Sequence, residues 1–305
     1  MTLLAALIAL VLEMQLTDPG RYRPTERLED AMRRLRGLFQ GSDFFMGWPG
    51  VLLTLALVPL AVGIVTDWLR GDGFIRNLLL LVFSLVILLW CLRVRDLWDR
   101  VRAYLALHDD ADEAVLRGHA RAILGREPEG GRASWPDQIM VTLLTQATDR
   151  LFGPLFWFVM LGPMGAVLFA SAVLLRDQTD AEEAGEDANR HQTFRHAARM
   201  AYRFLAWLPL RLLVTAFSLV GSFTDTLEGW RAHELRCLDV VKDAQAALVV
   251  CAGYGALSMD PPWSRSEDAP MAHGDEVKAI AGLLQRAFLV WMAAIFVLWA
   301  IGLLP

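Results

Sequence analysis

Four long apolar runs constrain the fold of this chain more than any other feature. Each run is close to the ~20 residues that an α-helix needs to cross the hydrocarbon core of a bilayer. They cover residues 44–66, 74–92, 152–175 and 287–304. Because lipid offers the backbone no hydrogen-bond partner, such runs must be helical. We therefore predict an all-α, polytopic helical membrane protein.

The composition supports this prediction and narrows the partners. Hydrophobic residues make up 55% of the chain and the mean hydropathy is +0.38, which is more apolar surface than one soluble core of this size usually buries. The lipid bilayer is therefore the first expected partner. A net charge of -5, without a basic face that carries interleaved aromatic residues, argues against nucleic acid. The three cysteines are odd in number and far apart, so we expect all of them to be reduced.

Some segments depart from the simple pattern of four spans. Gly162-Pro163 should kink or break the third run. Residues 1–12 are apolar but short, and we expect a retained, buried or re-entrant helix there rather than a cleaved signal peptide. Residues 209–223 are too short to cross lipid alone, and should pack inside the bundle or lie at the interface. As a helix they carry one polar stripe, which consists of Arg211, Thr215, Ser218, Ser222 and Asp225.

Arginines orient the chain in the membrane. Six of them precede the first run and eight follow the second, whereas the turn between these two runs carries only Arg70 and Arg76. By the positive-inside rule, both basic segments face the cytoplasm. We expect a multi-pass protein of the bacterial inner membrane. The acidic stretch at residues 176–189 would then face the periplasm, provided that residues 209–223 do not cross.

The segment after the second run has a helical pattern of its own. Apolar residues recur at helical spacing over residues 97–107, and Asp110 or Asp112 can cap a second helix that ends near Gly125. We predict a cytoplasmic helical hairpin here. The expected regions are an N-terminal membrane region, a cytoplasmic loop, a membrane motif region, an extramembrane region and a C-terminal transmembrane helix, at residues 1–92, 93–151, 152–225, 226–285 and 286–305.

Several motifs follow one another along the chain. They are the loop that ends in Gly125-Arg126-Glu127, then Gly153-Pro-Leu-Phe-Trp157, Leu161-Gly-Pro-Met-Gly165 and Phe204-Leu-Ala-Trp-Leu-Pro-Leu-Arg-Leu212. Their order resembles that of the motifs in the cobinamide-phosphate synthases. Over most of its length the chain resembles the superfamily of AmpE and the CobD/CbiB synthases. The opening leucine-rich helix that ends at Glu13 is similar to that of AmpE, the inner-membrane branch associated with β-lactamase induction. The resemblance implies a polytopic membrane protein.

Departures from the synthase pattern bear on the branch. The synthases carry a His-Pro-Val motif after an early Asp-Pro, whereas Asp18-Pro19 is followed here by Arg23-Pro24-Thr25. Their Glu-Asn, Asn-Thr-Leu-Asp and Gly-Arg-Asp motifs are replaced by Thr145-Gln146, Val173-Leu-Leu-Arg-Asp177 and Gly125-Arg126-Glu127. Joining a large anionic corrinoid to an amino alcohol phosphate needs such polar groups. These departures favour the AmpE-like branch.

Two functions remain open from the sequence. The first is an AmpE-like regulatory or sensor protein linked to cell-wall status and β-lactamase induction, expected to be non-catalytic and without a cofactor. The alternative is a membrane-bound cobinamide-phosphate synthase-like enzyme of cobalamin biosynthesis. A transporter is a third reading, weakened because ionisable residues within the apolar runs are few.

A polar or ligand site is expected to draw on charged residues of the shared motifs. We expect no catalytic set and no metal site, because no nucleophile-base pair and no metal-ligand spacing is found. A guanidinium at membrane depth costs about 2.5–3.5 kcal/mol, so Arg211 should pair with a carboxylate, Asp149 first and Asp18 second. The expected partners are an anionic small molecule or cell-wall-related ligand, and a protein partner or a second copy of the chain. The candidate residues are Asp18, Arg126, Glu127, Asp149, Arg211 and Asp225.

Overall fold

A computed structural model describes residues 47–71, 73–92, 94–107, 112–181, 192–236, 243–263 and 274–302. Every regular element in these ranges is helical, as predicted. Asp18 and the short apolar segment at residues 1–12 lie outside the described residues. The described chain divides into two compact units, which come from Met1–Leu92, Gly153–Leu208 and Leu298–Pro305, and from Arg93–Phe152 and Pro209–Val297. We call them unit 1 and unit 2.

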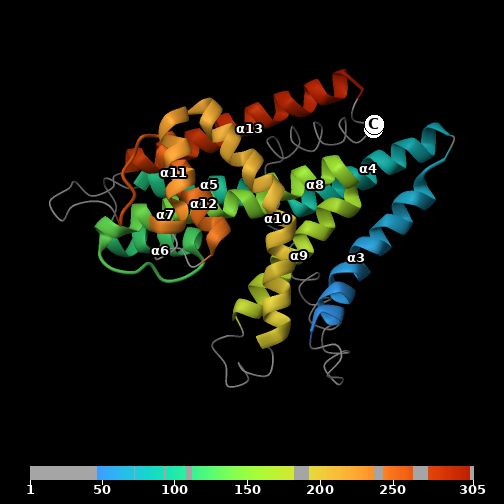
Figure 1. Cartoon of the computed structure of the whole chain (residues 1–305), viewed down its shortest axis with the longest axis horizontal. Coiled ribbons are helices and arrows are strands. Elements are labelled where there is room, and N and C mark those ends of the chain that lie inside the picture. Colours follow the sequence, from blue (N-terminus) through green and yellow to red (C-terminus); the bar gives the residue numbers. More distant parts are fainter. Residues whose placement is uncertain are drawn as a thin grey trace. The chain divides into compact units, whose positions relative to one another are not determined.

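Unit 1 contains two of the predicted membrane helices as a hairpin. Helix α3 (Trp48–Leu69) starts with Pro49 in its first turn and continues through Pro59, and α4 (Phe74–Cys91) follows after a short turn (Figure 1). Both helices are long and apolar enough to cross a membrane. Their boundaries agree with the predicted runs at residues 44–66 and 74–92 to within a few residues.

The third apolar run is two helices instead of one. Helix α8 (Gly153–Leu161) ends at Gly162, whose positive φ of 68° suits glycine, and α9 (Pro163–Ala181) begins directly after it. A Cβ atom added at Gly165 would collide with the backbone carbonyl of Trp157, so α8 and α9 pack closely. The expected break at Gly162-Pro163 is confirmed.

The polar-striped segment belongs to a longer helix than expected. Helix α10 runs from Gln192 to Val220, 29 residues, and its hydropathy and length suffice to cross a membrane. The expectation that residues 209–223 are too short to span therefore fails, because the helix begins well before Pro209. Proline inside a helix removes one backbone hydrogen bond but does not end this one.

Unit 2 contains the predicted helical hairpin. Helices α5 (Val94–Leu107) and α6 (Glu113–Leu124) pack against each other, with Asp112 at the N-cap of α6 and Gly125 at its C-cap. The side chain of Asp112 makes no capping hydrogen bond. Gly125 has a φ of 72°, the left-handed conformation that commonly ends a helix.

The remaining elements of unit 2 pack on this hairpin or on one another. They are η2 (Arg132–Ser134), α7 (Trp135–Ala147), the π-helical turn η3 (Thr148–Phe152), α11 (Phe223–Arg236), α12 (Ala244–Ala256) and most of α13 (Gly274–Ala300). Helix α7 packs against α6 and α12, and α11 packs against α12. Helix α13 is the fourth helix that is long and apolar enough to cross a membrane, and it starts earlier than the predicted run at 287–304.

Candidate functional site

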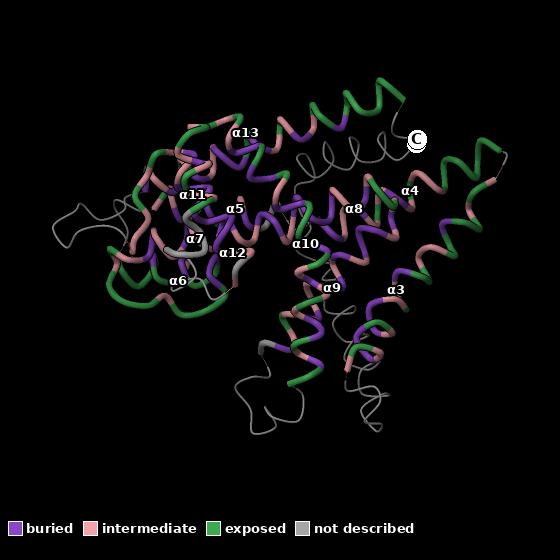
Figure 2. Tube along the Cα trace, in the orientation of Figure 1, coloured by how far each residue is buried: buried purple, intermediate pink, exposed green. Residues whose placement is uncertain are grey.

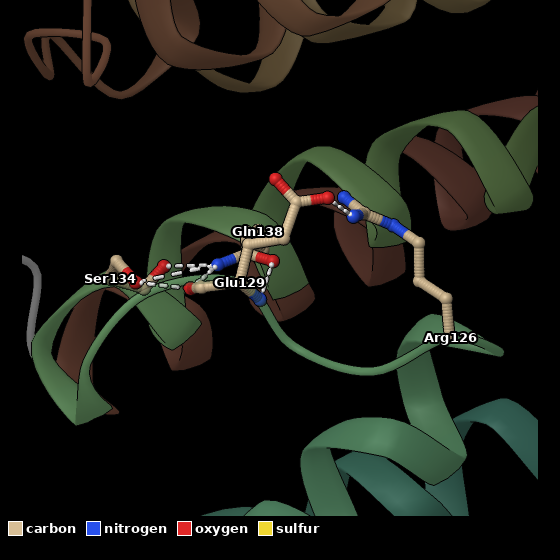
Figure 3. A network of polar contacts seen from close by, with 4 residues as sticks. All are labelled: Arg126, Glu129, Ser134 and Gln138. Atoms are coloured by element: carbon tan, nitrogen blue, oxygen red, sulfur yellow. Dashed lines mark hydrogen bonds and ion pairs between the residues drawn. The ribbon is translucent and has the colours of Figure 1, made fainter.

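The loop between α6 and α7 carries the Gly-Arg-Glu motif and is held by a polar network (Figure 3). The backbone N–H of Glu129 donates to Oε1 of Gln138 at 3.1 Å, and Nε2 of Gln138 donates to the carbonyl of Glu129 at 2.7 Å. The hydroxyl of Ser134 also donates to the Glu129 carbonyl, at 2.8 Å. These bonds fix the loop on the first turn of α7, and none of their three members was singled out from the sequence.

Arg126 and Glu127 each form an ion pair with a neighbour on the surface of unit 2. Arg126 pairs with Glu129, and Glu127 pairs with Arg121 of α6 at 2.8 Å. More than half of each of these four side chains is exposed. Exposed ion pairs contribute little stability, typically under ~1 kcal/mol, and their groups stay accessible to a charged ligand.

Beneath this loop lie two buried aromatic side chains. Trp135 at the start of α7 is fully buried, and the guanidinium of Arg117 lies 5.5 Å from its ring centroid. Tyr104 of α5 is also fully buried, and burial raises the pKa of its phenol to about 12, although the positive charge of Arg132 acts in the opposite direction. The charged loop is therefore next to buried aromatic side chains.

Asp149 lies in a π-helical turn that joins α7 to α8. The turn covers Thr148–Phe152, and π-helical turns inside helices are rare and frequent at functional sites. The Thr148 side chain is 2% exposed, and its hydroxyl has no hydrogen-bond partner among the described residues. Thr145 and Gln146, at the position of the synthase Glu-Asn motif, bond instead to backbone carbonyls of Val141 and Ile123.

The polar stripe of α10 is on the less buried side of its helix. The hydroxyl of Thr215 donates to the carbonyl of Leu212 at 2.7 Å, and that of Ser218 donates to the carbonyl of Thr215 at 2.8 Å. Leu213, Val214 and Phe217 are fully buried, whereas Arg211 is only partly buried. Arg211 and Asp149 both belong to unit 2, and their pairing stays a prediction.

Asp225 is held by two serines. Its Oδ2 atom accepts a hydrogen bond from Ser222 at 2.8 Å and one from Ser258 at 2.5 Å. These bonds, Ser258 first, stabilise the charged carboxylate and lower the pKa of Asp225 below its ordinary value. The backbone N–H of Ser222 also donates to the carbonyl of Ala256 at 2.8 Å, so the start of α11 is tied to the end of α12. Ser258 was missed because it follows Asp225 by 33 residues and no local pattern marks it.

A second charged cluster, absent from the sequence predictions, occupies unit 1. The guanidinium of Arg176 lies 4.1 Å from the ring centroid of Tyr202 and bonds to Asp177 at 2.7 Å. Arg176 is 17% exposed, unlike the exposed arginines of the 125–134 loop. Arg176 and Asp177 belong to the segment that replaces the synthase Asn-Thr-Leu-Asp motif.

The cysteines differ from expectation. Cys91 is free and buried, as predicted, whereas Cys251 is disulfide-bonded, so the prediction of three reduced cysteines is wrong. Within the described ranges, no group of three or more His, Cys, Asp or Glu side chains is placed to hold a metal ion.

Comparisons with known proteins identify the family. The family model described as "CobD/Cbib protein" matches residues 6–260. Two relatives named "Cobalamin biosynthesis protein CobD", from Stutzerimonas stutzeri (strain A1501) and Chromobacterium violaceum, are 27% and 28% identical to the chain. These alignments cover 84% and 83% of this chain, and 80% and 78% of the relatives.

A third relative, "Protein AmpE" of Shigella flexneri, is 24% identical over 76% of this chain and 78% of its own length. No solved structure matches the chain. Since the family model covers most of the sequence, and since the fold is an all-α membrane protein, the chain belongs to the CobD/CbiB family.

Proposed function

We propose that this chain works in cobalamin biosynthesis as a membrane-bound, cobinamide-phosphate synthase-like enzyme. The observation that carries the proposal is the match of the CobD/CbiB family model over residues 6–260. The two relatives named for cobalamin biosynthesis support it, because each alignment covers more than three quarters of both proteins. The enzyme would act on a large anionic corrinoid and an amino alcohol phosphate, which is what the resemblance to the synthases implies.

The identities of the relatives favour the synthase-like function over the AmpE-like role. The departures from the synthase motifs favour that role, but the AmpE relative is less identical to the chain than the two CobD relatives. Members of one enzyme family can differ at a few motifs that contact the substrate, because site residues can change while the fold is kept.

A second candidate is an AmpE-like regulatory protein linked to cell-wall status and β-lactamase induction. One observation favours it specifically. At the position of the synthase Asn-Thr-Leu-Asp motif, Arg176 is only 17% exposed, and its guanidinium bonds to Asp177 and lies over the ring of Tyr202. A group held in this way is less available to polarise a reacting substrate, and a signalling role requires no such polarisation.

The anionic ligand would be held by charged residues of the shared motifs. Arg126 offers a guanidinium that is more than half exposed, and Arg211 offers a second one in the membrane motif region. Guanidinium groups bind phosphate and carboxylate oxygens in a bidentate manner. In this proposal Asp149 orients Arg211. Asp225 and Glu127 are carboxylates of the surface that binds the ligand.

The chain would work as a multi-pass protein of the bacterial inner membrane. The arginine-rich segments before α3 and after α4 support a cytoplasmic location for both, and therefore for the α5–α6 hairpin. A corrinoid intermediate would then reach the loop at residues 125–134 from the cytoplasm. A second copy of the chain, or another protein, remains a candidate partner of this surface.

Complementation tests the proposal directly. The full chain is expressed in a strain that lacks its own cobinamide-phosphate synthase and is grown under cobalamin-dependent conditions. We expect growth with the parent chain and with Val115→Ala, an exposed-site control, and much weaker growth with Arg126→Ala. All variants must reach the membrane fraction in equal amounts. No growth with the parent chain at normal membrane levels, together with a changed β-lactamase induction, would replace the proposal by the regulatory role.

A further inference from the structure

If each of the four helices that are apolar and long enough crosses the membrane once, α11 lies on the opposite side of the membrane from α6. Helix α10 is the only one of the four candidate spans that lies between α6 and α11 in the described chain. If it crossed alone, the exposed charges of α6 and α11 would face different compartments. The contacts inside unit 2 alone indicate whether α6 and α11 face the same compartment.

A chain of direct contacts leads from α6 to α11. Arg117 of α6 lies over the ring of Trp135, the first residue of α7. Further along α7, a Cβ atom added at Gly253 of α12 would lie 2.7 Å from Cδ2 of Leu144. Two residues beyond Gly253, Gly255 lies against the backbone of Asp225 in α11.

The length of this path bears on the alternatives. Leu144 follows Trp135 by nine residues, which is about 14 Å of helix at 1.5 Å per residue. The other steps are side-by-side contacts within one compact unit, and the axes of packed helices lie about 8–10 Å apart. To cover the hydrocarbon core of about 30 Å, most of these steps would have to point in one direction along the membrane normal. The packing therefore favours a start of α11 on the same side of the membrane as the charged face of α6.

A position halfway through the bilayer is energetically unfavourable for α11. Its residues Glu228 and Arg231 are exposed. A charged side chain that faces lipid at mid-membrane costs about 2.5–3.5 kcal/mol, and two such residues on one short helix would cost correspondingly more. The carboxylate of Asp225 is likewise stabilised in its charged form by Ser222 and Ser258, as expected for a group near water.

We infer that α11 and the α5–α6 hairpin face the same compartment, so that the chain crosses the membrane an even number of times between Phe152 and Phe223. Helix α10 is then not a lone crossing: it is paired with a second crossing or does not cross. Arg126, Glu127 and Asp225 are then accessible from the same side of the membrane. The inference concerns relative sides only, so it does not depend on the proposed enzyme activity.

Single cysteines and an impermeant maleimide test the inference in intact and permeabilised cells. Val115→Cys places a thiol on α6 and Glu228→Cys places one on α11, both at exposed positions. Arg70→Cys, in the α3–α4 turn, is the control for the other side, because one crossing by α4 separates it from α6. The parent chain sets the background from its own cysteines, and membrane-fraction levels show that each variant folds.

We expect Val115→Cys and Glu228→Cys to behave alike and Arg70→Cys to behave oppositely. If the α6 side is cytoplasmic, the first two react only after permeabilisation and the third reacts in intact cells. Reaction of Glu228→Cys together with Arg70→Cys, but not with Val115→Cys, would overturn the inference and restore α10 as a lone crossing. Failure of the complementation experiment leaves this result unaffected.

Discussion

The α3–α4 hairpin and the core of unit 2 use the same apolar residue types for opposite purposes. In the window of α4 that can span a membrane only 17% of the residues are buried, and Phe74 and Ile75 are more than 70% exposed. Most of the α4 trace is coloured as exposed or intermediate (Figure 2). In unit 2, Tyr104, Leu116, Trp135 and Ile139 are fully buried against other helices. The hairpin leaves its apolar side chains exposed, as expected for contact with lipid, whereas the core of unit 2 buries them against protein. The same substitution should therefore have different effects in the two regions.

The largest difference is expected for aromatic side chains. Trp135→Ala removes a fully buried ring and leaves a cavity, which should lower the free energy of unfolding by about 3–5 kcal/mol. Phe74→Ala, at a side chain that is 83% exposed, should change it by less than about 0.5 kcal/mol. Denaturant titration in detergent micelles measures both. Equal losses would show that Phe74 is packed against protein.

A charge should reverse the comparison. Leu79→Arg places a guanidinium on an exposed position of α4, and we expect a penalty of about 2.5–3.5 kcal/mol for membrane insertion. Val115→Arg, on the exposed face of α6, should be nearly neutral. The fraction of chain inserted into microsomes reports the difference. Normal insertion of Leu79→Arg would mean that this part of α4 faces water.

Close helix packing in unit 2 gives a smaller effect with a matched control. A Cβ atom at Gly229 of α11 would lie 2.5 Å from the carbonyl oxygen of Cys251, so Gly229→Ala should cost about 1–3 kcal/mol. Gly118 of α6 has no atom within 4 Å of an added Cβ, and Gly118→Ala should stabilise the helix by up to ~1 kcal/mol. Thermal melting should shift in opposite directions. A gain from both substitutions would contradict the tight α11–α12 contact.

The smallest expected effect is on the stability of the protein at acidic pH. Because Ser258 and Ser222 lower the pKa of Asp225 from 3.8 in the folded chain, their contribution is present above pH 3.8 and is lost as the pH falls through the lower folded value. Ser258→Ala should bring the pKa of Asp225 closer to 3.8 and flatten the acid limb of the stability curve. Melting temperatures between pH 5 and pH 3 measure this. An acid limb unchanged by Ser258→Ala, in a variant otherwise as stable as the parent, would contradict the role of Ser258.

How far the sequence predicts the fold differs between local and long-range features. The α3–α4 hairpin and the α5–α6 hairpin follow from apolar runs and from Gly125, because each signal lies within the element that it defines. The start of α10 at Gln192 was missed because hydropathy marks only the apolar second half of the helix, whereas its first half alternates arginines with apolar residues. The candidate site depends still more on distant residues. Ser258 meets Asp225, and Gln138 meets Glu129, through contacts that no single segment of sequence specifies.

The π-helical turn at Thr148–Phe152 has a consequence for how the chain can change by insertion and deletion. A π-turn holds one more residue than the corresponding α-turn, and each residue rotates a helix by about 100°. Within this turn Thr148, Leu151 and Phe152 are buried. Removal of one residue here would restore a regular α-helical turn, but it would rotate the following side chains away from the positions in which they are now buried. The turn therefore does not tolerate a one-residue deletion as an ordinary surface loop would, and Asp149 lies inside it.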